Sequence, residues 1–66
     1  MRKELRRFRN NQFLTQQAMA EKLDVSVSTY NLIENGKRRG SQDFWLTIQK
    51  VFNLEDGQVW KLQKNK

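Results

Sequence analysis

Apolar residues recur at helical spacing along most of the chain. Leu5 and Phe8 lie three residues apart, which predicts a first helix over residues 3–11. Thr15 is a favourable N-cap residue, so we expect a second helix over residues 16–23. The small or apolar side chains that indicate this second helix are Ala18, Met19, Ala20 and Leu23.

The remainder of the chain predicts three further helices. Ser26 is an N-cap residue for a third helix, which we expect to end at Gly36 because glycine readily adopts the left-handed conformation that stops a helix. Ser41 begins a fourth helix in the same way, and Asn53 ends it. A last helix is expected over residues 56–62. The apolar side chains at helical spacing in these segments are Tyr30, Ile33, Phe44, Ile48, Val51, Phe52, Val59 and Leu62.

No segment predicts a competing β-strand. Residues 25–28 alternate apolar and polar side chains, but the alternation is short and a helical pattern follows it. The sequence contains no repeat, low-complexity tract or linker. We therefore expect an all-α fold, with a compact bundle of five short helices over residues 1–62 and a polar tail over residues 63–66.

The composition excludes most kinds of catalytic and metal site. The 66 residues include no His and no Cys, which removes disulfides, zinc–thiolate sites and every imidazole base or ligand. The seven carboxylates are scattered, and only Glu55 and Asp56 are adjacent. We therefore expect no enzymatic activity, no metal and no cofactor, and the chain has no evident pocket for a small-molecule ligand.

The chain also lacks signals for membranes and for secretion. No apolar run approaches the ~18 residues that a membrane-spanning helix needs. The basic N-terminus is not followed by the apolar segment of a secretory signal. A cytoplasmic protein without a membrane partner is the expectation.

The net charge of +6 is unevenly distributed along the chain. Residues 1–9 carry five cations against one carboxylate, and residues 37–39 are three consecutive cations. Residues 10–36 carry one cation against three carboxylates. Clustered cations are typical of proteins that bind a polyanion such as nucleic acid. The alternative is that the clusters only make the surface more soluble.

Residues 15–36 have the pattern of a helix-turn-helix motif. Two short helices are joined by a turn of about three or four residues, and Ala20 is small where the helices must approach closely. From about residue 5 to residue 62, the chain resembles the phage repressor and Cro class of helix-turn-helix domains, often called Xre-like. The residues that carry this resemblance are Leu14, Thr15, Gln16, Ala20, Ile33, Glu34, Asn35, Gly36, Lys37, Arg38, Phe44, Ile48 and Leu54.

Two positions depart from the pattern of this family. Asp24 stands in the turn where the family usually has glycine, and we expect it to adopt a positive φ with modest strain. Gly40 and Ser41 stand where a proline often follows the basic loop, and this loop is longer by about one residue than in close phage relatives.

The resemblance implies a lambda repressor-like fold and a transcriptional regulator that binds double-stranded DNA, most simply a repressor that blocks a promoter. In such domains the third helix enters the major groove. Its outward-facing residues, expected to read bases, are Val27, Ser28, Asn31 and Leu32.

These four side chains predict different base contacts. Ser28 can bond to several base edges, and Asn31 suits adenine. Val27 and Leu32 suit the methyl group of thymine. The alternatives are that Leu32 packs against Phe13 or a neighbour on its helix, and that Val27 only packs at the helix start.

Phosphate contacts are expected beside the third helix. The amide and the backbone N–H of Gln16 lie at the start of the second helix, where the helix dipole favours an anion. The resemblance implies the same role for the residues after the third helix, which are Asn35, Lys37, Arg38 and Arg39. Arg2, Lys3, Arg6 and Arg7 either add to the attraction for DNA or form the solvated face of the first helix.

The resemblance also implies an ion pair between Arg9 and Glu34, with a mainly structural role. The planar guanidinium group of arginine suits a partly buried carboxylate. The alternative is two independent surface charges.

One such domain reads about half of a two-fold site, so we expect a weak homodimer that strengthens on DNA. Trp60 and Leu62 are the expected dimer contacts, and the alternative is that Trp60 and Trp45 only cover the core. A different class of function is a DNA-binding antitoxin or another protein-interaction module with this fold. A third is non-specific nucleic-acid binding. In each case the protein would be bacterial or phage-encoded and act in the cytoplasm, at the nucleoid.

Overall fold

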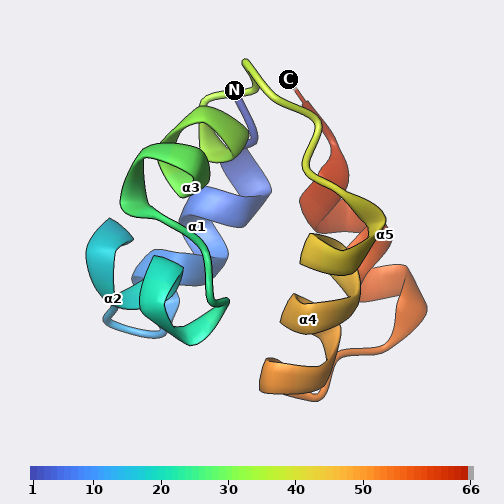
Figure 1. The fold of residues 1–66 in the computed structure, drawn as a ribbon. Helices are drawn as coiled ribbons and strands as arrows, with labels where there is room; N and C mark the ends of the chain where they lie inside the picture. Colours follow the sequence, from blue (N-terminus) through green and yellow to red (C-terminus); the bar gives the residue numbers. More distant parts are fainter. Residues whose placement is uncertain (66) are drawn as a thin grey trace.

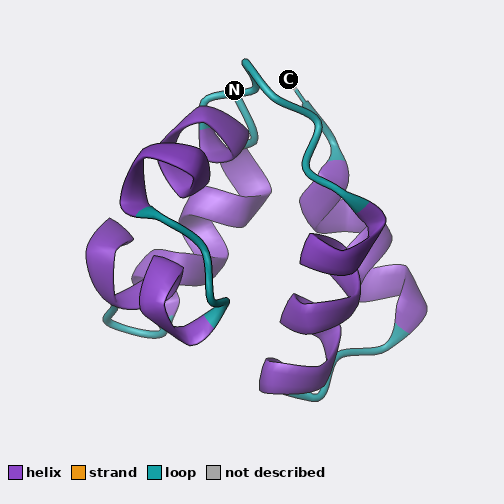
Figure 2. Cartoon of the chain, in the orientation of Figure 1, coloured by secondary structure: helices purple, strands orange, loops and turns teal. Residues whose placement is uncertain are grey.

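The computed structural model describes residues 1–65, which form five α-helices joined by short loops (Figure 1, Figure 2). The helices are α1 (Lys3–Asn11), α2 (Gln16–Lys22), α3 (Val27–Glu34), α4 (Gln42–Phe52) and α5 (Asp56–Gln63). The described residues contain no β-strand, so the all-α prediction is confirmed. Of the expected tail over residues 63–66, Gln63 is still part of α5, and Lys66 lies outside the described residues.

Three of the helices begin with a side-chain cap at the residue that the sequence predicts. The hydroxyl oxygens of Thr15, Ser26 and Ser41 each accept a hydrogen bond, 3.1 Å long, from the backbone N–H three residues later. Each cap satisfies one of the N–H groups that have no partner in the first turn of a helix. The starts of α2, α3 and α4 are therefore determined by short-range chemistry.

Left-handed residues end two of the helices and shape the turn between α2 and α3. Gly36 has a φ of +80°, and the N–H of Lys37 then bonds back to the carbonyl of Leu32 at 2.9 Å. Asn53 ends α4 with a φ of 54°. Asp24 has a φ of 58°, which confirms the positive φ expected where the family usually has glycine.

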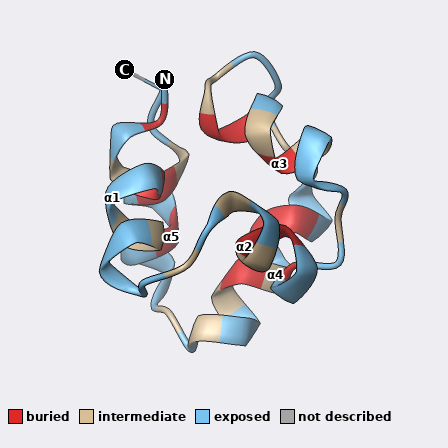
Figure 3. Ribbon diagram, turned by 90° about the vertical axis from the view of Figure 1, so that its left-hand side faces the viewer, coloured by how far each residue is buried: buried red, intermediate tan, exposed pale blue. Residues whose placement is uncertain are grey.

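The helices pack around one core. α1 contacts α3 and α5, α2 packs on α3, and α4 packs on α5. Figure 1 shows α1, α2 and α3 on one side of the molecule and α4 and α5 on the other. Buried residues, red in Figure 3, lie on all five helices. The core consists of Leu5, Met19, Ala20, Leu23, Tyr30, Ile33, Phe44, Trp45, Ile48, Val59 and Leu62.

The inner face of α4 differs from the prediction. Val51 was expected to face inward, but its side chain is 43% exposed, whereas Trp45 is buried. The buried residues of α4 are Phe44, Trp45 and Ile48, and Phe52 is partly buried, so Val51 falls at the edge of this face in the last turn. Trp45 therefore belongs to the core and does not merely cover it.

The two ends of the described chain meet beside the loop that follows α3 (Figure 1). The N-terminal ammonium of Met1 donates a hydrogen bond to Oδ1 of Asn65 at 2.8 Å. Nδ2 of Asn65 donates to the carbonyl of Gly36 at 3.1 Å. Both ends of the described chain are thus tied to the turn that follows α3.

Phe13 is the least favourable local feature of the fold. It lies between α1 and α2 with a φ of 59°, and its side chain is 95% exposed. A left-handed conformation costs roughly 1–2 kcal/mol in a residue with a Cβ atom, and almost no packing offsets that cost here.

We therefore expect Phe13→Gly to raise the free energy of unfolding by roughly 1 kcal/mol, after allowing for the extra freedom of glycine in the unfolded chain. Thermal unfolding should show this as an increase of about 4–8 °C in Tm. Gln12→Gly is the matched control, because the neighbouring Gln12 has a φ of −88° and should only lose stability. Equal losses in both variants would contradict the assignment of strain to Phe13.

Candidate nucleic-acid interface

The helices α2 and α3 are joined by a tight turn over residues 23–26. The N–H of Val25 bonds to the carbonyl of Ala20 at 3.0 Å, and Ala20 is fully buried between the helices. The absence of a longer side chain at Ala20 lets the two helices approach closely. This pair of helices is the helix-turn-helix that the sequence pattern predicts.

The outer face of α3 carries the residues expected to read bases. Val27, Ser28 and Leu32 are exposed, and Asn31 is half-buried. Tyr30 and Ile33 point into the core. Leu32 is 36% exposed and Phe13 is 95% exposed, so Phe13 does not cover Leu32. The outer face of α3 is therefore a mixed apolar and polar surface that other helices leave open.

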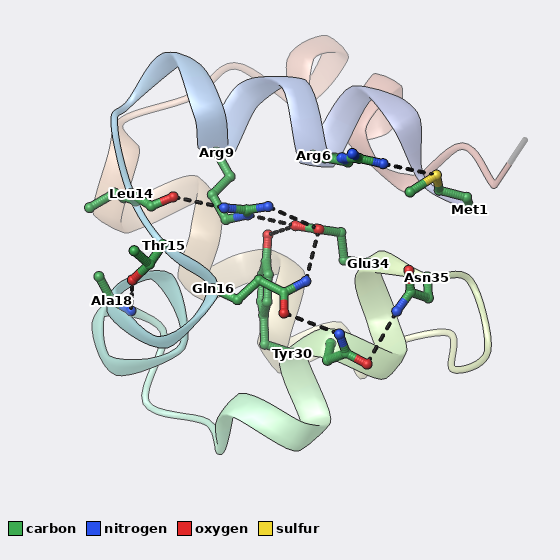
Figure 4. A network of polar contacts seen from close by, with 11 residues as sticks. Met1, Arg6, Arg9, Leu14, Thr15, Gln16, Ala18, Tyr30, Glu34 and Asn35 are labelled. Carbon is green, nitrogen blue, oxygen red and sulfur yellow. Dashed lines mark hydrogen bonds and ion pairs between the residues drawn. The ribbon is translucent and has the colours of Figure 1, made fainter.

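The last residue of α3, Glu34, has a buried carboxylate. The side chain of Glu34 is only 2% exposed, and Nε of Arg9 lies 2.8 Å from its Oε2 atom. Nη2 of Arg9 donates to Oε1 of Glu34 at 3.2 Å, so the pair is bidentate. The third donor of Arg9, Nη1, bonds to the carbonyl of Leu14 at 2.8 Å. The structure thus brings Arg9 and Glu34 together and attaches the α1–α2 loop to them (Figure 4).

Two further side chains donate to the same carboxylate. The hydroxyl of Tyr30 donates to Oε2 of Glu34 at 2.7 Å, and Nε2 of Gln16 donates to Oε1 at 3.0 Å. With Arg9, donors from α1, α2 and α3 all converge on one carboxylate, as Figure 4 shows. This arrangement fixes the three helices relative to one another.

The hydrogen bonds keep the Glu34 carboxylate ionised. Burial alone would raise the pKa of Glu34, but the hydrogen bonds from Arg9, Tyr30 and Gln16 outweigh burial and lower it. Burial and the hydrogen bond to Glu34 raise the pKa of Tyr30 far above its usual value. The hydrogen bond to Glu34 likewise raises the pKa of Arg9. At neutral pH the network therefore holds a carboxylate, a guanidinium and a neutral phenol.

The network continues from Glu34 to the outer face of α3. Oε1 of Gln16 accepts a hydrogen bond from Nδ2 of Asn31 at 3.1 Å, and Oδ1 of Asn31 accepts one from Nδ2 of Asn35 at 3.1 Å. Three residues expected to contact DNA are thus linked to one another. Their sequence positions alone do not reveal this, because Gln16 and Asn31 belong to different helices.

The basic loop, which we define as Lys37, Arg38 and Arg39, follows α3 directly. All three side chains are exposed. The loop lies over Arg2, a residue that is only 5% exposed and whose guanidinium donates to backbone carbonyls of the loop.

Arg2 is the site residue whose position the sequence prediction missed. It was expected to lie with Lys3, Arg6 and Arg7, either attracting DNA or on the solvated face of α1. Those three residues are exposed, but Arg2 is buried. Its spacing of three residues from the buried Leu5 is the signal that could have indicated an inward position.

The expected dimer contacts lie in different surroundings. Trp60 is 69% exposed, whereas Leu62 is buried in the core and offers no surface for a second chain. Trp60 borders a shallow pocket between α4 and α5, and Leu46, which is 48% exposed, lies on the same pocket. The exposed apolar surface here therefore consists of Trp60 and Leu46.

Within residues 1–65, no group of side chains has the composition of a metal site. No described helix has both the length and the apolar character needed to cross a membrane.

Comparison with protein families agrees with this geometry. A family model described as Helix-turn-helix matches residues 5–57, which include most of α1, all of α2 to α4 and the start of α5. Neither the curated proteins nor the solved structures contain a match to the chain.

Because the carboxylate of Glu34 is buried, Glu34→Ala should lower the free energy of unfolding by about 3–5 kcal/mol, leaving the partly buried Arg9 without its ionic partner. Denaturant unfolding measures the loss, and Glu34→Gln, which keeps one acceptor oxygen, should lose less. Glu4→Ala is the matched control, since Glu4 and Arg7 form an exposed pair at 3.3 Å and its removal should cost under ~1 kcal/mol. A near-neutral Glu34→Ala would show that the pair is not buried in solution.

Proposed function

We propose that this protein is a repressor with a pseudo-palindromic operator. The premise is that the chain belongs to the helix-turn-helix family of the phage repressor and Cro type (Xre-like), which makes it a DNA-binding transcription regulator. The observation that carries the proposal is the position of the basic loop. Its three exposed cations follow closely after the end of α3. The outer face of α3 is open, and Glu34 fixes the last turn of this helix through its bond to Arg9. Such a protein would act at the bacterial nucleoid by binding, and not by catalysis.

In this proposal α3 lies in the major groove and its outer face reads the bases. Val27 and Leu32 would contact thymine methyl groups, and Ser28 would bond to base edges. Asn31 would contact adenine, with its amide orientation set by Gln16 and Asn35. The face carries no charged side chain, so discrimination between bases would rest on hydrogen bonds and methyl contacts.

Phosphate contacts would flank α3 and fix its register on the duplex. Lys37, Arg38 and Arg39 would contact one strand of the backbone. Asn35 would contribute its side chain from the end of α3. Gln16 would contact a phosphate through its backbone N–H at the start of α2, while its side-chain amide bonds to Glu34 and Asn31.

We further propose that the regulator binds its operator as a weak homodimer that strengthens on DNA. Trp60 and Leu46 form an exposed apolar surface on α4 and α5, away from the core positions of those helices. Large aromatic side chains are typical anchors of protein interfaces. A two-fold dimer through this surface would place two copies of α3 on neighbouring half-sites, about one helical turn of DNA apart.

Selection of bound sequences from a random duplex pool tests the proposed function. We expect a two-fold symmetric motif with A·T pairs opposite Leu32 and Val27, preferred over random DNA by about 10³ or more. Leu32→Gln should change the preference at one position of each half-site and leave the others unchanged. If no motif emerges, the protein is not a sequence-specific regulator; a motif that Leu32→Gln leaves unchanged at every position would remove Leu32 from the reading face.

Sedimentation of the protein on its selected operator tests the dimer. We expect two copies per operator, and we expect Trp60→Lys to weaken binding to the full operator but not to a single half-site. Val51→Lys is the matched control, because Val51 is an exposed apolar residue of α4 outside the pocket that Trp60 borders. One copy per operator at stoichiometric concentration would refute the dimer.

A further inference from the structure

Arg2 makes an unusual set of contacts for a residue so near a chain end. Its guanidinium is buried and donates four hydrogen bonds, all to backbone carbonyls. Nη1 donates to Ile33 at 2.5 Å and to Arg38 at 2.8 Å. Nη2 donates to Arg39 and Nε to Gln63, both at 3.2 Å. One side chain thus joins the end of α3, the basic loop and the end of α5.

The charge of Arg2 has no carboxylate partner in the part of the chain that the structure describes. The ion pairs within residues 1–65 are those of Arg7 with Glu4 and of Arg9 with Glu34. Burial lowers the pKa of Arg2, and two of the carbonyls that its guanidinium contacts, those of Arg38 and Arg39, belong to the basic loop. An apolar side chain could fill a core position at a lower desolvation cost, so the net charge of Arg2 points to a role in addition to packing.

The hydrogen bonds of Arg2 determine how the loop peptides are oriented. The carbonyls of Arg38 and Arg39 point inward to the guanidinium, and the carbonyl of Arg39 also accepts from Nε1 of Trp45 at 3.2 Å. In a planar trans peptide the N–H points opposite to the carbonyl. The N–H groups of Arg39 and Gly40 therefore point away from Arg2.

Neither of these two N–H groups bonds to another described residue. Successive backbone N–H groups that point the same way form an anion-binding surface. Gly40 has a φ of +80°, and a Cβ atom there would come within 3.0 Å of Nε1 of Trp45. Trp45 also lies under Arg2, whose guanidinium carbon is 5.5 Å from the centre of the tryptophan ring.

We propose that Arg2 is a positioning residue for DNA binding: it turns the carbonyls of the basic loop inward, so that the N–H groups of Arg39 and Gly40 and the loop cations face one phosphate group of the duplex. Arg2 itself stays buried and contacts no DNA. Its unpaired charge adds to the attraction for the phosphate from beneath the loop. This inference rests on the proposed function, because it concerns the same DNA-binding surface.

A double-mutant cycle tests the proposal in the full chain. One arm is Arg2→Met, which keeps a long unbranched side chain but removes the donors. The other arm replaces Lys37, Arg38 and Arg39 together by Gln. Binding is measured on the selected operator and on random duplex DNA, over a range of salt concentrations and below the Tm of each variant.

We expect Arg2→Met to weaken binding at least about tenfold on both DNAs, which is the loss expected for one charge-assisted contact. It should also reduce the slope of log Kd against log salt by about 1, although the side chain itself is hidden. In the background without loop cations, Arg2→Met should change binding under about threefold, because the phosphate is no longer held there. Lys3→Met, which removes an exposed charge from the residue next to Arg2, should act alike in both backgrounds.

A loss of stability alone would not produce this coupling. Arg2→Lys keeps the charge but has only three donors on a single atom. Compared with Arg2→Met, it should recover part of the lost stability and little of the lost affinity for DNA. Amide NMR spectra supply a direct readout: adding either duplex should shift the N–H signals of Arg39 and Gly40 in the unmodified protein and leave them unshifted in Arg2→Met.

Three outcomes overturn the positioning role. They are an equal effect of Arg2→Met in both backgrounds, an unchanged salt slope, and unshifted amides of Arg39 and Gly40 in the unmodified protein. The random duplex separates this failure from failure of the proposed function. A protein that binds all sequences alike is not a specific regulator, but the phosphate contact and its dependence on Arg2 are still measured on that DNA.

Discussion

The buried carboxylate of Glu34 is the group on which the helix-turn-helix half of the molecule depends. Arg9 from α1, Gln16 from α2 and Tyr30 from α3 all donate to it, so one charge sets the relative positions of three helices. Removing any donor would leave a buried carboxylate with fewer partners, which is strongly unfavourable. The same constraint orients α3, because its inner face cannot rotate without breaking these bonds. The exposed residues on its outer face are thereby held in a defined direction.

Arg2 shows the opposite way of burying a charge. Glu34 has a cationic partner of its own, whereas Arg2 bonds only to neutral carbonyls, among them those at the end of α3, where the helix dipole is negative. The first arrangement is complete within the folded chain. The second leaves a net positive charge beneath a loop of three cations, a distribution that a phosphate group would neutralise. The two groups meet at the end of α3, where the backbone N–H of Arg2 donates to the carbonyl of Glu34 at 2.8 Å.

The features of this fold that could be predicted from the sequence are those that depend on neighbours a few residues away. Thr15, Ser26 and Ser41 cap their helices through bonds that span three residues, and Asp24 adopts its positive φ within a single turn. Helical spacing identified nearly all of the core. It was wrong for Val51, because spacing alone places this residue on the inner face of α4, while the packing of α4 on α5 centres the buried face elsewhere.

The sequence by itself determined where the helices begin and end, the helix-turn-helix class and the two clusters of positive charge, since each of these is local along the chain. Only the tertiary structure decided which charges are buried. Arg9 meets Glu34 across 25 residues, and Arg2 meets Arg39 across 37 and Gln63 across 61. Whether an arginine is solvated or buried depends on what distant segments place around it. A cation at position 2 therefore looks the same in the sequence as its exposed neighbours, and its hydrogen bonds to the loop exist only once the chain has folded.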